Sequence, residues 1–150
     1  MPAHRAAKSF LALATAVVAL LAVPACSVVD EIAYQRHSTS FEDVSQMNED
    51  GALQLKWMPS DATSIRLVES TREGATDATV LVDSASDLDP AVCAPVDRQS
   101  APSLSIAGAP DVYAVDTVYA CGKWTIVPTR GGWYGWTPNA PGEEVQTPSP

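Results

Sequence analysis

Apolar and polar residues alternate in several short stretches of this chain, and the first stretch lies just after residue 51. In LQLKWM, the apolar residues Leu53, Leu55 and Trp57 alternate with polar ones, which is the period of a half-buried strand. Pro59 ends this strand, and Asp61 close behind it favours one short helical turn. The pattern therefore predicts a strand and a turn at the start of the folded region.

The next two apolar stretches have the spacing of a β-hairpin. IRLVES and ATVLVDS lie on either side of TREGATD, in which Gly74 supplies the turn. The run from Val80 to Val82 is apolar on both faces of its strand, as is typical of strands that are covered on both sides. We therefore expect the second strand of this hairpin to lie inside the sheet.

The last third of the chain has the strongest strand pattern. DVYAVDTVYACGKWTIV places four side chains on one face of a strand: Tyr113, Val115, Tyr119 and Cys121. Beyond Gly122, Trp124 and Ile126 have the opposite parity, so a bulge or bend at Cys121-Gly122 would bring both sets to one core. TRGGWYGWT then predicts a Gly-Gly turn and a final strand.

The clearest helix start is SDLDPAVC, with Asp89 as a candidate N-cap and Pro90 at the first helical position. Pro95 follows so soon that this helix must be short, and residues 98–110 predict a loop. Together these elements predict a small α+β domain over residues 51–138. We expect a mainly antiparallel sheet of about five strands with one or two short helices, and an all-β sandwich is the alternative.

Both flanks of this domain are polar. Residues 26–50 include RHSTSFEDVSQMNED, whose acidic composition predicts a flexible tether, with Phe41 and Val44 spaced for a short helix near its end. Residues 139–150, NAPGEEVQTPSP, have few apolar side chains to pack, which predicts a disordered tail.

The first 25 residues have the layout of a secretory signal. Arg5 and Lys8 precede fifteen residues, 9–23, that carry no charge. A helix of that length extends about 22 Å, too short for a hydrocarbon core of about 30 Å. Val23 and Ala25 are small enough for signal peptidase, so we expect cleavage after Ala25.

The residues VPAC that end this run resemble the lipobox of bacterial lipoproteins, in which a cysteine becomes the lipidated first residue. Pro24 departs from the small residue that is usual at its position. The resemblance implies that Cys26 carries several acyl chains, such as palmitate, which suffice for stable membrane attachment. It places the protein on the extracytoplasmic face of the cell membrane. Plain secretion and an uncleaved anchor are the alternatives.

Net charge limits the possible partners, and the cysteine count agrees with this location. Without the signal, seven basic residues face eighteen acidic ones, a net charge of −11, which disfavours binding to nucleic acid. If lipid occupies Cys26, then Cys93 and Cys121 remain as an even pair in an oxidising compartment. We therefore predict a disulfide between them.

Groups that could support catalysis or bind metals are few. His37 is the only histidine after the signal, and it lies in the expected tether. Carboxylates occur in three groups whose surroundings predict no burial: Glu42 with Asp43, Glu49 with Asp50, and Asp83 with Asp87 and Asp89. The last group lacks the glycine and glutamate of a calcium-binding EF-hand loop, and no zinc or nucleotide motif is present. We therefore predict no catalytic residue, metal or cofactor.

Aromatic residues are the remaining candidates for a binding site. Four lie close together among glycines: Trp124, Trp133, Tyr134 and Trp136. Such side chains can present flat faces to a sugar ring or a partner protein. This hypothesis requires at least two of Trp133, Tyr134 and Trp136 to be exposed in one patch. The alternative is that they fill the core.

With VPAC, WMPSDATSIRL, VYACGKW and GGWYGWTP, the chain is similar to small uncharacterised envelope lipoproteins of actinobacteria. That resemblance implies no activity, cofactor or substrate. We expect a non-enzymatic module that binds an envelope protein, a glycan or a small ligand. A small hydrolase using two facing carboxylates and a purely structural spacer are the alternatives.

Overall fold

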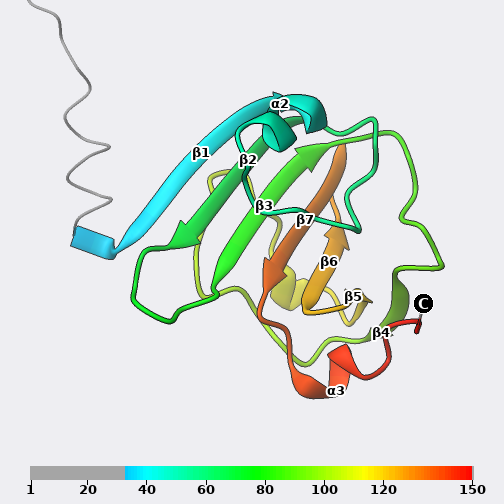
Figure 1. Ribbon diagram of the computed structural model, residues 1–150. Coiled ribbons are helices and arrows are strands. Elements are labelled where there is room, and N and C mark those ends of the chain that lie inside the picture. Colours follow the sequence, from blue (N-terminus) through cyan, green and yellow to red (C-terminus); the bar gives the residue numbers. More distant parts are fainter. Residues whose placement is uncertain (1–32, 150) are drawn as a thin grey trace, which may run out of the picture.

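The computed structural model describes residues 33–149, which form one antiparallel sheet of seven strands. Figure 1 shows β1 along one edge, and the strand order is β1-β2-β3-β7-β6-β5-β4. The strands are β1 (Arg36–Asp43), β2 (Thr63–Ser70), β3 (Ala78–Asp83), β4 (Ala94–Asp97), β5 (Thr117–Cys121), β6 (Trp124–Pro128) and β7 (Gly132–Thr137). Two very short α-helices, α2 (Val44–Glu49) and α3 (Pro141–Glu144), and one 3₁₀ turn, η1 (Val112–Ala114), complete the fold. The mainly antiparallel sheet is confirmed, but it is open and has seven strands rather than about five.

Strand β1 and helix α2 correct the expectation of a flexible tether for residues 36–49, whereas residues 26–32 of that tether lie outside the described residues. Strand β1 pairs with β2 from Arg36 opposite Ser70 to Asp43 opposite Thr63. Only Phe41 of this strand is fully buried, so backbone hydrogen bonds rather than apolar side chains hold most of it. Helix α2 follows directly. Asp43 caps it by accepting from the Gln46 N–H at 2.9 Å.

The strand expected at LQLKWM does not form, because this stretch crosses over the sheet instead of pairing with it. Residues 52–55 have no regular secondary structure. Trp57 is buried against the sheet, whereas Leu53 is 39% exposed. The turn expected after Pro59 is present, since the Ala62 N–H donates to the Pro59 carbonyl at 3.1 Å.

The hairpin expected around Gly74 is confirmed. β2 and β3 pair in antiparallel fashion on either side of residues 71–77, and Gly74 has a φ of +75° in that loop. β3 lies between β2 and β7, with all of its residues buried except Asp83. The apolar run that it carries therefore faces packed side chains on both sides of the sheet.

The bulge or bend expected at Cys121-Gly122 is a tight hairpin turn that joins β5 to β6. Cys121 pairs directly with Trp124, which leaves Gly122 and Lys123 as a two-residue turn. Gly122 has a φ of +63°, the left-handed conformation that glycine adopts without strain. The turn places Tyr119, Cys121 and Trp124 against the same cluster, as the expected bulge would have done.

The expected helix after Asp89 is reduced to one turn. The Asp89 carboxylate accepts from the Ala91 N–H at 2.8 Å, and its carbonyl accepts from the Val92 and Cys93 N–H groups. The chain then becomes β4, which contains Pro95. Proline is tolerated there because β4 is an edge strand.

The tail over residues 139–150 also departs from its expected disorder. Helix α3 lies within it, and Glu143 is completely buried. A buried carboxylate that accepts several hydrogen bonds fixes this segment, so its low apolar content does not prevent it from folding.

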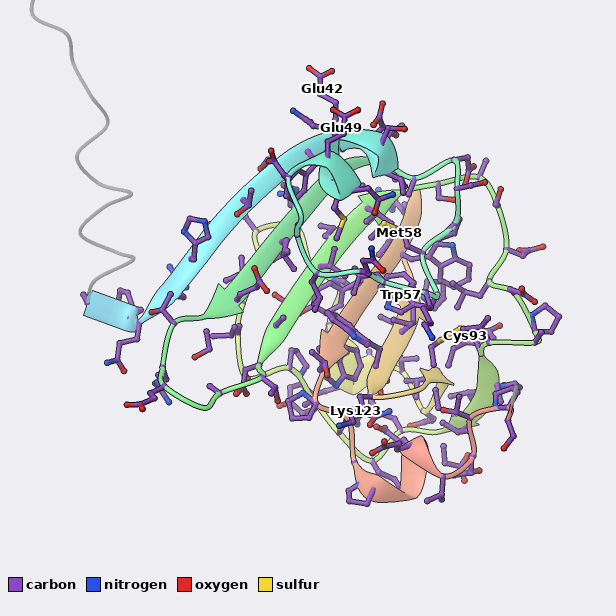
Figure 2. All side chains as sticks on the ribbon, in the orientation of Figure 1. Glu42, Glu49, Trp57, Met58, Cys93 and Lys123 are labelled. Atoms are coloured by element: carbon purple, nitrogen blue, oxygen red, sulfur yellow. A yellow bond between two sulfur atoms is a disulfide. The ribbon has the colours of Figure 1, made fainter. Side chains whose placement is uncertain are left out.

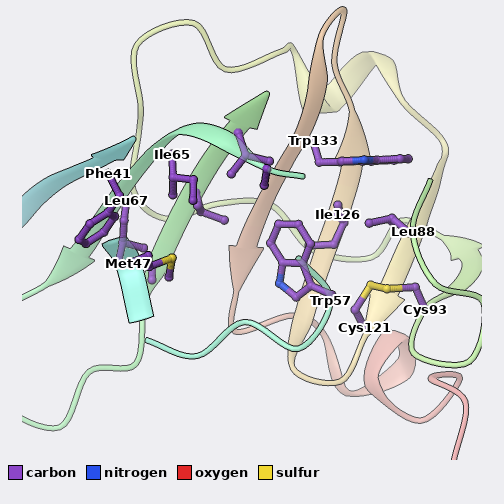
Figure 3. Packing of buried hydrophobic residues seen from close by; sticks show 14 residues of the cluster. Phe41, Met47, Trp57, Ile65, Leu67, Leu88, Cys93, Cys121, Ile126 and Trp133 are labelled. Carbon is purple, nitrogen blue, oxygen red and sulfur yellow. A yellow bond between two sulfur atoms is a disulfide. The ribbon is translucent and has the colours of Figure 1, made fainter. Parts of the chain in front are cut away.

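Apolar clusters cover both faces of the sheet. One cluster contains Trp57, Ile126 and Trp133, together with α2 and the segment after it, and Figure 3 shows its packing. The other contains Tyr134 and Trp136 under residues 101–115. Among the described residues, no helix has the length and hydropathy needed to cross a membrane.

Candidate functional site

The predicted aromatic patch is not a surface feature, which corrects the first binding hypothesis. Trp133 is 9% exposed, and Tyr134 and Trp136 are 1% exposed each. The Trp133 indole donates to the Ser86 carbonyl at 3.0 Å, and the Trp136 indole donates to the Ser100 hydroxyl at 2.9 Å. Burial raises the pKa of Tyr134 to about 12, so this phenol stays neutral. These three residues belong to the core.

Trp124 differs, because it lines a cleft of about 590 Å³ that the sequence did not reveal. Residues 54–57, 91–92, 121–124 and 147–148 line this cleft, which we call the Lys-Trp cleft. Two adjacent residue pairs, Lys56-Trp57 and Lys123-Trp124, face it from opposite parts of the chain. Figure 2 shows Trp57, Lys123 and the nearby Cys93.

The two indoles form the aromatic part of the cleft. The ring centroids of Trp57 and Trp124 lie 6.0 Å apart, and the ring planes meet at 49°. Trp57 is 3% exposed, whereas Trp124 is only partly buried. Tyr119 packs against the same cluster, with its ring edge-to-face against Trp133. One ring is therefore fixed in the core, and the other faces the open side.

Lysines supply the charge of the cleft. Lys56 and Lys123 are exposed, and they are the only lysines after Lys8. No aspartate or glutamate is among the described residues that line the cleft. This is a basic, apolar surface on a protein that is otherwise strongly acidic.

The floor of the cleft is the β5–β6 turn, and the tail holds it in place. The Asn139 side-chain amide donates to the Gly122 carbonyl at 3.0 Å and to the Trp124 carbonyl at 3.2 Å. The Lys123 carbonyl accepts from the Thr137 hydroxyl at 2.8 Å, and the Gly122 N–H donates to the Thr147 hydroxyl at 3.0 Å. The backbone that carries Lys123 and Trp124 is thus fixed without a ligand.

One side of the cleft is tied down covalently. The predicted disulfide between Cys93 and Cys121 is present, and it spans 28 residues of sequence. Cys121 lines the cleft, and Val92 beside Cys93 forms part of its wall. The bond therefore connects the turn after Asp89 to the floor of the cleft.

Glu143 anchors the tail that completes the cleft. One carboxylate oxygen accepts from the Gln99 and Ser100 N–H groups at 2.7 and 3.0 Å. The other accepts from the Ser100 hydroxyl at 2.5 Å, the Thr125 hydroxyl at 2.7 Å and the Ala140 N–H at 3.1 Å. Burial alone raises the pKa of Glu143, but the hydrogen bonds from Ser100, Gln99, Thr125 and Ala140 outweigh it and lower the pKa below its ordinary value. The carboxylate is therefore ionised at neutral pH.

Two of the predicted acidic residues, Asp83 and Asp87, line a second, more polar cleft of about 720 Å³. Asp61 and Arg130 line it with them. Asp61 accepts from the Ser84 hydroxyl at 2.6 Å and the Ala85 N–H at 3.0 Å, and these bonds lower its pKa. A general acid needs a raised pKa, so Asp61 does not have the properties of one.

The other predicted residues lie apart from both clefts. Asp43 caps α2, Glu42, Glu49 and Asp50 are exposed around that helix, and Asp89 caps its own turn. His37 is exposed on the edge strand β1. Within residues 33–149, no three metal-ligating side chains come together. Cys26 lies outside the described residues.

A sequence signal for the Lys-Trp cleft did exist. The two lysines that follow the signal each directly precede a tryptophan, at positions 56–57 and 123–124. Their meeting depends on the crossing of residues 52–62 over the sheet, which the strand pattern did not predict.

Comparisons with protein-family models, curated proteins and solved structures found no match.

Proposed function

We propose that the chain is a lipid-anchored protein of the cell envelope whose folded domain is a non-enzymatic binding module. Cys26 attaches the protein to the membrane, and the Lys-Trp cleft is its binding site. This proposal keeps the expected location and class of function. It moves the site from the aromatic residues of β7 to Trp57 and Trp124.

The observation that carries the proposal is the cleft itself. Its volume of about 590 Å³ lies within the range of about 300–1,000 Å³ that is typical of small-molecule sites. It combines an aromatic pair, aliphatic walls and a few polar groups, which is the usual composition of a ligand pocket. Its backbone is also fixed in advance by Asn139 and the disulfide, which reduces the entropy lost on binding.

A binding role fits the chemistry of the cleft better than catalysis does. Cys121, the cysteine that lines the cleft, cannot act as a nucleophile because it is in the disulfide with Cys93. The Thr147 hydroxyl accepts a hydrogen bond from the Gly122 N–H, and the remaining potential nucleophiles, the amines of Lys56 and Lys123, are exposed rather than buried in an apolar site that would activate them. Among the described lining residues there is no histidine or carboxylate to act as a base.

The membrane anchor rests on the N-terminal sequence, and a disulfide is consistent with an oxidising compartment. Intact-mass analysis of the membrane fraction tests it. A mature chain that begins at a Cys26 carrying acyl chains is the expected species. An unmodified Cys26 in the mature chain would refute the anchor.

The binding site is tested with phenylnaphthylamine, an uncharged aromatic probe that fluoresces in apolar surroundings. The full chain carrying Cys26→Ser, which cannot be lipidated, is the parent. We expect Trp124→Ala to weaken probe binding by about thirtyfold or more, since truncating a binding hot spot costs about 2 kcal/mol or more.

Tyr113→Ala is the matched control, because Tyr113 is an aromatic residue that is 72% exposed and lies outside the cleft. It should leave probe binding unchanged. Trp124→Leu, which preserves an apolar side chain, serves if Trp124→Ala does not fold. Equal affinity in the parent and in the folded Trp124 variants would exclude the cleft as the binding site.

A further inference from the structure

We infer that the ligand of the Lys-Trp cleft is a small organic anion with a flat apolar body, whose carboxylate, sulfonate or phosphate is held by Lys56 and Lys123. This inference rests on the proposed binding function and specifies its ligand class. It follows from how charge and aromatic surface are distributed over the molecule.

The placement of the lysines is the first step. Both lysines of the folded domain line this one cleft, although the chain after the signal carries a net charge of −11. At physiological ionic strength, charges separated by more than about 8 Å are largely screened. Lys56 and Lys123 are the charged side chains among the described residues that line the cleft, so they make it the place on this acidic protein where an anion is attracted.

The second step is that these lysines have no structural task in the described part of the chain. No carboxylate there forms an ion pair with Lys56 or Lys123. Two arginines, by contrast, are used to hold loops: Arg66 donates to the Ala107 carbonyl, and Arg98 donates to the Val115 carbonyl. The lysine ammonium groups are thus able to donate to a ligand.

The third step concerns the apolar part of the ligand. The cleft places the partly exposed Trp124 ring beside Trp57, with Leu55 and Val92 among the other lining side chains. A flat or aromatic body can pack against these surfaces while its charged group stays at the lysines. A highly charged ligand without an apolar body would leave the aromatic surface uncovered.

The test compares two probes with nearly the same aromatic body. Anilinonaphthalene sulfonate carries a negative charge, and phenylnaphthylamine does not. In the full chain with Cys26→Ser, we expect the double variant Lys56→Gln/Lys123→Gln to weaken sulfonate binding about tenfold to a hundredfold, the range for losing hydrogen bonds to a charged group. Binding of the neutral probe should change less than about twofold.

The control is Arg72→Gln/Arg130→Gln, which removes the same charge at two exposed residues outside the cleft. It should leave both probes unaffected. Added salt should weaken binding of the sulfonate and leave that of the neutral probe unchanged.

The possible results separate this inference from the proposed function. If the lysine variant binds the sulfonate as tightly as the parent does, while Trp124→Ala still loses the neutral probe, the anion preference is wrong and the cleft remains a binding site. If Trp124→Ala changes binding of neither probe, the binding function of the cleft is wrong and the inference fails with it.

Discussion

At the scale of single residues, Glu143 holds the tail against the sheet through hydrogen bonds, whereas apolar packing holds most other segments of the molecule. It is fully buried, yet each of its oxygens accepts more than one hydrogen bond. Through it, the tail is fixed to the segment after β4 and to Thr125 of β6. Because the tail supplies Thr147 and Asn139 to the floor of the Lys-Trp cleft, this carboxylate also supports the proposed binding site.

Glu143→Gln should lower the free energy of unfolding by about 2–4 kcal/mol, because an amide cannot accept all of these hydrogen bonds. The NH₂ group of the glutamine would face either the Ala140 N–H or the Gln99 and Ser100 N–H groups. Two hydrogen-bond donors would then face each other with no acceptor between them. Glu144→Gln is the control. Glu144 is exposed, so this substitution should change the free energy of unfolding by less than about 0.5 kcal/mol. Urea unfolding of both variants measures the difference.

The same substitution should change the pH dependence of stability. Because the folded-state pKa of Glu143 lies below its ordinary value of 4.5, its stabilising contribution is complete above that pH and is lost as the pH falls through the folded-state pKa. The stability gap between the parent and Glu143→Gln should therefore narrow in acid. A gap that stays constant down to pH values of about 2 would contradict the assigned role of the ionised carboxylate.

Gly135 provides a second residue-scale test, because it lies under Trp57. A Cβ atom at this position would be 2.6 Å from the Ile126 Cδ1 atom and 3.1 Å from the Trp57 Cζ2 atom. We expect Gly135→Ala to destabilise the protein by about 1–3 kcal/mol, as overpacking of a core does. Gly131→Ala is the control, since its nearest contact would be an ordinary 3.5 Å. Thermal unfolding measures both variants. If Gly135→Ala melts at the same temperature as Gly131→Ala, the core at Gly135 is loosely packed.

At the scale of elements, the alternation of apolar and polar residues predicted the hairpins of the inner strands. It did not predict the edge strand β1, and it wrongly predicted a strand at LQLKWM. β2, β3 and β7 carry apolar residues that pack on the sheet, so their pattern reflects their environment. β1 has few such residues and is held by backbone pairing, which composition does not report. LQLKWM alternates like a strand, but tertiary packing of Trp57 decided its conformation.

The disulfide is the element-scale feature with the most direct consequence. Replacing both cysteines, Cys93→Ala/Cys121→Ala, should lower the free energy of unfolding by about 3–4 kcal/mol in the chain-entropy treatment of a loop this long. The substitutions are made in the Cys26→Ser parent, in which Cys93 and Cys121 are the remaining cysteines, so the parent itself is the reference with the bond intact. Denaturant unfolding with and without a reducing agent checks the effect. If reduction leaves the parent as stable as before, the disulfide does not stabilise the fold.

At the scale of the whole molecule, the fold brings together what the sequence keeps apart. Lys56-Trp57 and Lys123-Trp124 are separated by more than a third of the chain, and they meet because residues 52–62 cross the sheet toward the β5–β6 turn. The cysteine count predicted the disulfide, and local patterns predicted most of the strands. They could not predict this cleft, because its four lining segments come from distant parts of the sequence. Composition suggested a binding role for aromatic residues, but burial decided which of them are accessible.

The indole N–H signals in an NMR spectrum of the full Cys26→Ser chain test the central claim most directly. The chain has four tryptophans, and only Trp57 and Trp124 line the Lys-Trp cleft. On titration with phenylnaphthylamine, we predict that the signals of these two residues shift together and saturate, while that of Trp136, buried on the other face of the sheet, stays unchanged. Saturable shifts confined to Trp133 or Trp136, or no shift at Trp57 and Trp124, would contradict the account.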